Sequence, residues 1–115
     1  MAKTKKAGHS FEDYFKRALN PMLVLVLLKE ESMYVYQMQQ ELKRRSGGTY
    51  TISLLYPVLY RLEEQGYVVL SQQQITEDNR VRGYYSITPE GLEYLEHIKE
   101  VYRDLCQAVE IILQS

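Results

Sequence analysis

A change of residue periodicity in the second half of the chain does most to limit its fold. Up to Gly66, apolar residues recur at helical spacing, but the segments YVVLSQQQ (67–74) and VRGYYSIT (81–88) are rich in the residues of β-strands. The polar stretch ITEDNR between them predicts a turn, and Gly83 predicts a bulge or a close backbone approach. We therefore expect one antiparallel hairpin with a long, charged tip.

Helical patterns fill the chain before the hairpin. Ser10 is expected to cap a helix through Phe11, Phe15 and Leu19, and the pair Asn20–Pro21 either starts a second helix or bends the first. The run MLVLVLL (22–28) is apolar on every face, which predicts a place in the middle of the core.

A shorter helix is expected from Met33 to about Arg45. Ser32 is its candidate N-cap, and Gly47–Gly48 should end it because glycine adopts the left-handed cap at little cost.

The segment TISLLYPVLYRLEEQ (51–65) predicts the next helix, capped by Thr51 or Ser53 and ended by Gly66. Its inner face is an apolar stripe of Leu55, Val58, Leu59 and Leu62. With that stripe turned inward, the side chains directed outward or on the flank are those of Ser53, Tyr56, Pro57, Tyr60, Arg61 and Glu64. Exposed tyrosines on a helix indicate a working surface, and the alternative is that Tyr56 and Tyr60 pack under the hairpin.

A long helix is expected after the hairpin, with Thr88 as N-cap and Pro89 in its first turn. Apolar residues then recur in steps of three and four, which is the spacing of a coiled-coil seam: Leu95, Ile98, Tyr102, Leu105, Val109 and Ile112. This face either packs on its own domain or pairs with a partner helix. We favour the partner, because the upstream helices and the hairpin can close a core without it.

The distribution of charge separates a body from a tail. Residues 1–89 hold 12 Lys or Arg and 9 Asp or Glu, whereas residues 90–115 hold 2 and 6. A basic body with an acidic terminal helix fits a nucleic-acid-binding head joined to a helix with another task. The expected organisation is a flexible basic arm at 1–10, a winged-helix domain at 11–88 and a dimerisation helix at 89–115.

Other features exclude several classes of protein. The single cysteine, Cys106, allows no internal disulfide, and no apolar run is long enough to cross a bilayer, so a cytoplasmic location is expected. The sequence contains no glycine-rich phosphate loop, no paired-histidine metal spacing and no cysteine–histidine catalytic set, so we expect neither an enzyme nor a cofactor.

Three helices followed by a hairpin form a winged helix-turn-helix, in which the third helix enters the major groove of DNA. The expected fold class is therefore mainly α, with a small β-hairpin and a long C-terminal helix. The outward residues of segment 51–65 then become candidate DNA contacts, because tyrosine hydroxyls donate to phosphates and base edges and apolar groups meet thymine methyls.

The blocks YPVLYRLEEQGYV (56–68) and GYYSITPEG (83–91) resemble the PadR family of bacterial transcriptional regulators, and LVLVLL and MYVYQMQQEL fit the same pattern. The single helix after the hairpin resembles that of the short subfamily. The resemblance implies a homodimer that binds an inverted-repeat operator in double-stranded DNA, usually as a repressor released by a small molecule.

Carried over by position, the resemblance implies DNA contacts from the start of the second helix, the third helix and the basic wing. With Thr51 included at the start of its segment, the candidates are Tyr34, Tyr36, Thr51, Ser53, Tyr56, Pro57, Tyr60, Arg61, Arg80 and Arg82. Departures from the family pattern are Val35 in place of a glycine and Gly83 in place of a lysine. Drug-binding members carry a tryptophan on the last helix, where this chain has Tyr102, so stacking of a planar aromatic effector on Tyr102 is one hypothesis and a plain seam tyrosine the other.

A second class of function is kept beside DNA binding. The same outer aromatics can form a docking patch for a protein partner, which would make the chain a winged-helix interaction module without an operator.

Overall fold

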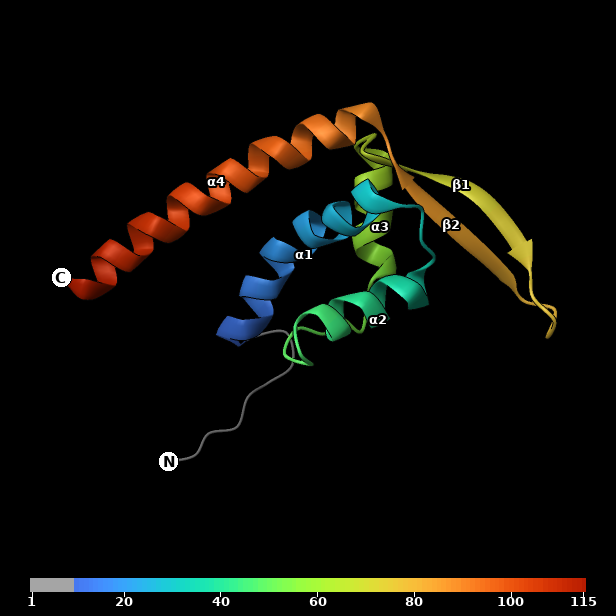
Figure 1. Ribbon diagram of the computed structural model, residues 1–115, viewed down its shortest axis with the longest axis horizontal. Coiled ribbons are helices and arrows are strands. Elements are labelled where there is room, and N and C mark those ends of the chain that lie inside the picture. The colour runs from blue at the N-terminus through green and yellow to red at the C-terminus, as the bar shows by residue number, and fades with distance from the viewer. Residues whose placement is uncertain (1–9) are drawn as a thin grey trace.

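The computed structural model describes residues 10–115, and it has the predicted fold class. Three helices come first, then the hairpin and a long helix: α1 (Phe11–Glu30), α2 (Val35–Arg45), α3 (Tyr56–Glu64), β1 (Val68–Ile75), β2 (Val81–Ile87) and α4 (Pro89–Gln114). Figure 1 shows that the hairpin and α4 leave the three helices in opposite directions. The arm expected at 1–10 lies, apart from Ser10, outside the described residues.

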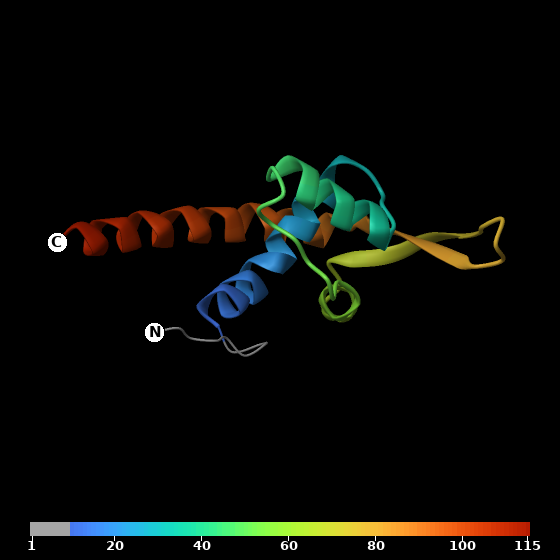
Figure 2. The same cartoon turned by 90° about the horizontal axis from the view of Figure 1, so that it is seen from below.

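The second half of α1 is the centre of the core, as its apolar run predicts. Val24, Leu25, Leu27 and Leu28 are buried, and they share one cluster with Leu59 and Leu62 of α3. Pro21 lies inside a continuous α1, so no second helix starts there. Ser10 is the N-cap, as expected, and its hydroxyl accepts a hydrogen bond from the Asp13 N–H over 3.1 Å. Figure 2 shows α4 and the hairpin forming one line, with α2 on one side of it and α3 on the other.

The start of α2 differs from the prediction. Met33 does not enter the helix, because it forms a β-bridge with Tyr85, with N–H to carbonyl distances of 3.2 and 2.9 Å. The helix therefore begins at Val35 with Tyr34 as N-cap, and Ser32 lies opposite Ser86 instead. The assignment of Ser32 as N-cap was wrong, whereas the expected end at Gly47–Gly48 is confirmed: α2 ends at Arg45, and both glycines have positive φ.

The start of α3 also differs. The helix begins at Tyr56, and its N-cap is Leu55, which provides no side-chain cap. The prediction that Thr51 or Ser53 caps this helix was therefore wrong, and residues 51–55 form an irregular segment before it. Pro57 consequently lies in the first turn, where a missing N–H removes no intrahelical hydrogen bond.

The hairpin is antiparallel, and its register contains one irregularity. Leu70 pairs with Tyr85 and Gln72 with Tyr84, so Ser71 is the extra residue of a bulge. Gly83 lies on the other strand, where an added Cβ would be 2.7 Å from the Leu70 Cδ1 atom. The bulge lies at Ser71 on the facing strand and not at Gly83, and what approaches Gly83 closely is the Leu70 side chain, not another backbone.

The first turn of α4 is bonded to the end of α3. The Thr88 hydroxyl accepts from the Gly91 N–H over 3.0 Å, as expected of an N-cap, and donates to the Gly66 carbonyl over 2.7 Å. The Thr88 N–H also donates to the Tyr67 carbonyl over 3.0 Å. These bonds fix the beginning of α4 against the turn that ends α3.

The apolar face of α4 is divided between two environments. Leu95 is completely buried in the core of its own chain and Ile98 packs against that core, whereas Tyr102, Leu105, Val109 and Ile112 are exposed. The prediction of Leu95 as a dimer contact was therefore wrong, because no surface of its side chain remains for a partner. The core also needs the beginning of α4, contrary to the expectation that the upstream elements close it alone.

Candidate nucleic-acid interface

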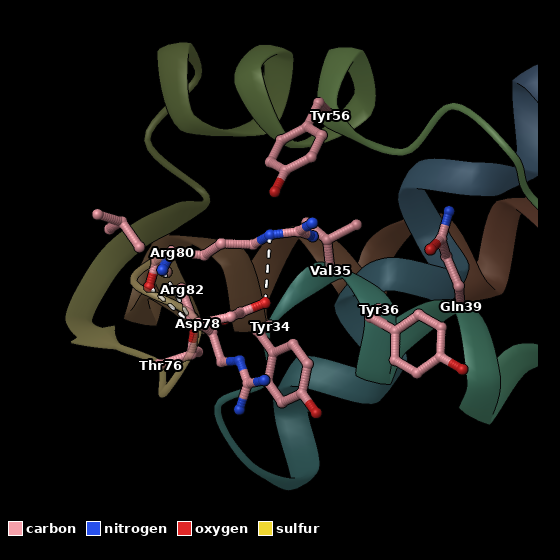
Figure 3. A pocket seen from close by; sticks show the side chains of 11 residues that line it. Tyr34, Val35, Tyr36, Gln39, Tyr56, Thr76, Asp78, Arg80 and Arg82 are labelled. Carbon is pink, nitrogen blue, oxygen red and sulfur yellow. Dashed lines mark hydrogen bonds and ion pairs between the residues drawn. The ribbon is translucent and has the colours of Figure 1, made fainter.

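Three elements converge on one face of the domain: the start of α2, the start of α3 and the outer half of the hairpin. They border an open groove of about 390 Å³. Tyr34, Tyr36 and Gln39 come from α2, Tyr56 from α3, and Arg80 and Arg82 from the hairpin (Figure 3). The fold thus brings together five of the candidate DNA contacts from three separate parts of the sequence.

Arg82 is held in place by aromatic rings. Its guanidinium carbon lies 4.2 Å from the centre of the Tyr34 ring, which is the geometry of a cation–π contact. Tyr34 in turn meets Tyr84 edge to face, with ring centroids 5.3 Å apart. An arginine fixed in this way keeps its N–H groups available for an anion while losing little side-chain freedom on binding.

Arg80 is nearer the tip of the hairpin and has a carboxylate partner. Its Nε lies 3.3 Å from an Asp78 oxygen, and both side chains are largely exposed. In Figure 3 the Arg80 side chain extends across the groove below Tyr56. An exposed ion pair contributes little free energy, so Arg80 can exchange Asp78 for another anion at little cost.

The outer face of α3 is accessible. Tyr56 and Tyr60 are 50% and 55% exposed, and their rings lie 5.9 Å apart on successive turns. The neighbouring Pro57 and Arg61 are exposed as well. About half of each tyrosine is therefore accessible and not covered by the hairpin, and the Tyr56 side chain also borders the groove.

The beginning of α2 offers backbone donors on the same face. Within residues 10–115, no side chain caps this helix, so its first N–H groups and the positive end of its dipole suit an anion. Tyr36 is exposed at this end, and Tyr34 is half-buried under Arg82.

Thr51 and Ser53 are exposed on the approach to α3 rather than on the helix. The Thr51 carbonyl accepts from the Lys16 ammonium over 3.3 Å. The Gln39 amide donates to the carbonyls of Ile52 and Ser53 over 3.0 and 3.4 Å. The sequence alone did not single out Gln39, because nothing in its spacing shows that α2 faces this segment.

Two arginines at the end of α2 are paired with carboxylates of their own chain. Arg45 makes ion pairs with Glu30 and Glu41, and Arg44 makes one with Glu41. Hydrogen bonds from Arg44 and Arg45 lower the pKa of the Glu41 carboxyl to about 2. Arg44 and Arg45 are therefore less available to a polyanion than Arg82 on the hairpin.

Comparison with known proteins agrees with this geometry. The model of the transcriptional regulator PadR-like family matches residues 24–97, which is more than half of the chain. The chain belongs to this family. The family comprises transcriptional regulators, not enzymes, and a candidate metal site of three or more ligand side chains is absent from residues 10–115.

Individual relatives of this PadR-like chain cover nearly its whole length. It is 30% identical to the transcriptional regulator Rv3488 of Mycobacterium tuberculosis over 95 residues, which are 83% of this chain and 86% of the relative. A crystal structure of a PadR family transcriptional regulator from Eggerthella lenta has 30% identity and a TM-score of 0.77, covering 89% of this chain and 88% of the other. A transcriptional regulator from Clostridium thermocellum has 26% identity and a TM-score of 0.74, over 88% and 96% of the two chains.

Two further properties of the PadR-like chain concern its long helices. None of the helices within residues 10–115 has the length and apolar character that a bilayer-spanning segment requires. Beyond Val101, α4 has a row of exposed apolar side chains that its own domain does not cover. Tyr102 lies in this row beside Cys106, and a hydrogen bond with the thiol raises the pKa of the Tyr102 phenol.

Proposed function

We propose that the chain is a sequence-specific DNA-binding repressor that acts as a homodimer on an inverted-repeat operator. The observation that carries this proposal is the continuous exposed face of α3, the start of α2 and the hairpin, with Arg82 fixed over Tyr34 at its centre. Tyrosine and arginine donors directed from three elements suit a duplex, since phosphate contacts set the register and base contacts give the preference.

In this arrangement the beginning of α3 enters the major groove. The residues nearest the base edges are then Ser53, Tyr56 and Pro57. One turn further along the helix are Tyr60 and Arg61.

Phosphates beside the groove are contacted by Thr51, Tyr34 and Tyr36. The DNA backbone next to the hairpin is contacted by Arg80 and Arg82. Glu64 ends the helix at the side that leaves the groove, where its carboxylate is least repelled.

The dimer is proposed to form through the far part of α4. Four exposed side chains of α4 recur at coiled-coil spacing: Tyr102, Leu105, Val109 and Ile112. Ile98, one turn before them, packs against the core of the domain. A two-fold partner would cover these side chains. It would also place the second recognition helix about one duplex turn, ~34 Å, from the first, which an inverted repeat requires.

Release by a planar aromatic effector is the second part of the proposal. Tyr102 supports it, since this residue is 40% exposed in the middle of the proposed seam. Two such rings at a two-fold axis can stack on a flat ligand. The competing role of Tyr102 is that of a seam side chain only.

The deciding experiment is footprinting of the full chain on the DNA around its own coding region, with and without candidate planar aromatic compounds. We expect protection of two half-sites and a steep loss of affinity with salt, because bound lysine and arginine release counterions. Equal affinity for this DNA and for a scrambled duplex at physiological salt would overturn the proposal. A reporter gene behind the protected site distinguishes repression from activation.

The protein-docking alternative makes a different prediction for the exposed tyrosines. A Tyr56→Ala, Tyr60→Ala variant should lose operator preference and keep its fold if the patch binds DNA, since both rings are half-exposed. An interaction module would instead show no operator preference in the wild type. It would lose its protein partner on the same substitutions.

A further inference from the structure

An exposed leucine stands at the entrance to the recognition helix. Leu54 is 76% exposed, whereas Ile52 and Leu55 on either side of it are 9% and 1% exposed. The predicted apolar stripe of this segment includes Leu55 and not Leu54, so the sequence already separates the two leucines, but its periodicity assigns Leu54 no role. The structure assigns Leu55 to the core and leaves Leu54 outside.

The segment that carries Leu54 is fixed on both sides. Ile52 and Leu55 are inserted into the core, and the Gln39 amide donates to the carbonyls of Ile52 and Ser53 directly before Leu54. A leucine held in this way presents its side chain in a defined place and loses little backbone freedom on binding.

Leu54 directly precedes the N-cap of α3, Leu55. In helix-turn-helix proteins the N-terminal end of the recognition helix is the part that contacts base edges. Leu54 therefore lies with Ser53 and Tyr56 at the end of α3 that enters the groove under the proposed function.

The chemistry of the side chain restricts what it can recognise there. Leucine has no hydrogen-bond donor or acceptor, and the apolar feature of base edges in the major groove is the C5-methyl group of thymine. We propose that Leu54 is a specificity-determining residue that contacts a thymine methyl in each operator half-site. This inference rests on the proposed function and adds to it the base that one side chain recognises.

The test removes single methyl groups from the DNA. Once footprinting has defined the half-site, each of its thymines is replaced in turn by deoxyuridine, and the dissociation constant is measured for the wild type and for Leu54→Ala. We expect one position at which the wild type loses about fourfold in affinity per half-site, the value of one buried methyl-sized group. Leu54→Ala should bind thymine and deoxyuridine equally at that position.

Matched variants separate this effect from a general loss of binding. Leu92→Ala shortens an exposed aliphatic side chain on α4, and it should keep the full methyl dependence. Leu54→Ala should keep the melting temperature of the wild type, since the side chain is mostly in solvent. The wild-type measurement with deoxyuridine needs no variant, so it stands even if Leu54→Ala does not fold.

The three outcomes are distinct. A wild type that prefers its operator but is indifferent to every thymine methyl overturns the role of Leu54 and leaves the proposed function intact. The role of Leu54 is overturned in the same way if Leu54→Ala keeps the wild-type methyl dependence. A wild type with no operator preference overturns both proposals.

Discussion

Tyr34 and Arg82 join the start of α2 to the hairpin, with the guanidinium carbon 4.2 Å from the ring centre. Tyr84 supports the same ring from the edge. Two elements far apart in the sequence thus meet through one cation–π contact. The orientation of Arg82 depends on a neutral side chain, so its contribution to DNA binding should depend on Tyr34 as well.

Substitution of this pair tests the dependence. Arg82→Ala should weaken binding to all duplexes alike and reduce the slope of log affinity against log salt by about 1, because one phosphate contact is lost. Tyr34→Leu should weaken binding in the same sequence-independent way. The double variant should lose less affinity than the sum of the two single variants, since both changes remove the same cation–π contact and Tyr34 adds only its own phosphate contact. Fluorescence anisotropy over a series of salt concentrations measures all three.

Arg103→Ala is the matched control for this pair, because it removes an exposed arginine from α4 and should leave affinity and salt slope unchanged. Independent, additive effects of the Tyr34 and Arg82 substitutions would show that the stacking does not orient the arginine.

The exposed row on α4 gives a second prediction, for the oligomeric state. Leu105→Lys with Val109→Lys should yield monomers and abolish operator binding together, because two charges cannot be buried in an apolar seam. Sedimentation equilibrium and footprinting on the same preparations measure both losses. Gln107→Lys with Gln114→Lys adds the same charge on the opposite face of the helix and should remain dimeric. A monomeric wild type would contradict the proposed dimer directly.

Gly91 gives a prediction about stability. A Cβ at this position would lie 2.2 Å from the Tyr67 carbonyl oxygen and 2.8 Å from the Ile87 Cγ1 atom. The carbonyl belongs to the backbone and cannot move freely, so Gly91→Ala should lower the free energy of unfolding by about 3 kcal/mol, at the upper end of overpacking effects. Urea denaturation followed by circular dichroism measures the change.

Gly83→Ala provides the comparison, since its Cβ would meet only the tip of the Leu70 side chain, which can rotate away. It should cost clearly less than Gly91→Ala. Equal costs would mean that the junction between the hairpin and α4 is looser than the close contact implies.

Tyr50 gives a prediction about pH. Its hydroxyl donates to Asn20 over 2.6 Å, and burial raises the pKa of the phenol to about 12 from an ordinary value near 10. The unfolded chain therefore deprotonates first, so the stabilisation from Tyr50 is complete below pH 10 and is lost as the pH rises towards 12. The difference in unfolding free energy between wild type and Tyr50→Phe should shrink over that range. At neutral pH, Tyr50→Phe should cost about 1 kcal/mol for the lost hydrogen bond. A difference that stays constant from pH 9 to 12 would contradict this account.

Some features of the fold could be predicted from the sequence because a single physical rule decides them. The apolar run of residues 22–28 can only be buried, and its residues form the middle of the core. Thr88 before Pro89 is a capping pattern that nothing in the tertiary structure opposes. The change of periodicity at Gly66 likewise located the hairpin to within one residue at either strand start.

The starts of α2 and α3 could not be predicted because tertiary contacts override local capping preference. The sequence offers Ser32 a good capping position, but the bridge between Met33 and Tyr85 keeps the chain extended past it. In α3 the burial of Leu55 places a leucine at the N-cap in preference to Thr51 or Ser53. Both decisions depend on residues distant in the sequence, which periodicity does not reveal.

Some residues of the candidate interface could likewise be predicted from the sequence, and others could not. The exposed side of α3 follows from its apolar stripe, so Tyr56, Pro57 and Tyr60 were found from the sequence. The bond from Gln39 to the segment before α3 depends on how α2 faces that segment, so it could not be predicted from the sequence.

The hydroxyl of Thr88 makes hydrogen bonds to residues on both sides of the junction between α3 and α4. It accepts from the Gly91 N–H in the first turn of α4 and donates to the carbonyl of Gly66, two residues after the end of α3, so it joins the two helices at that point. With 26 residues at a rise of 1.5 Å each, α4 is about 39 Å long. Because Thr88, the close packing at Gly91 and the buried Leu95 all fix the beginning of α4 to the domain, the direction of the whole helix is set within its first two turns.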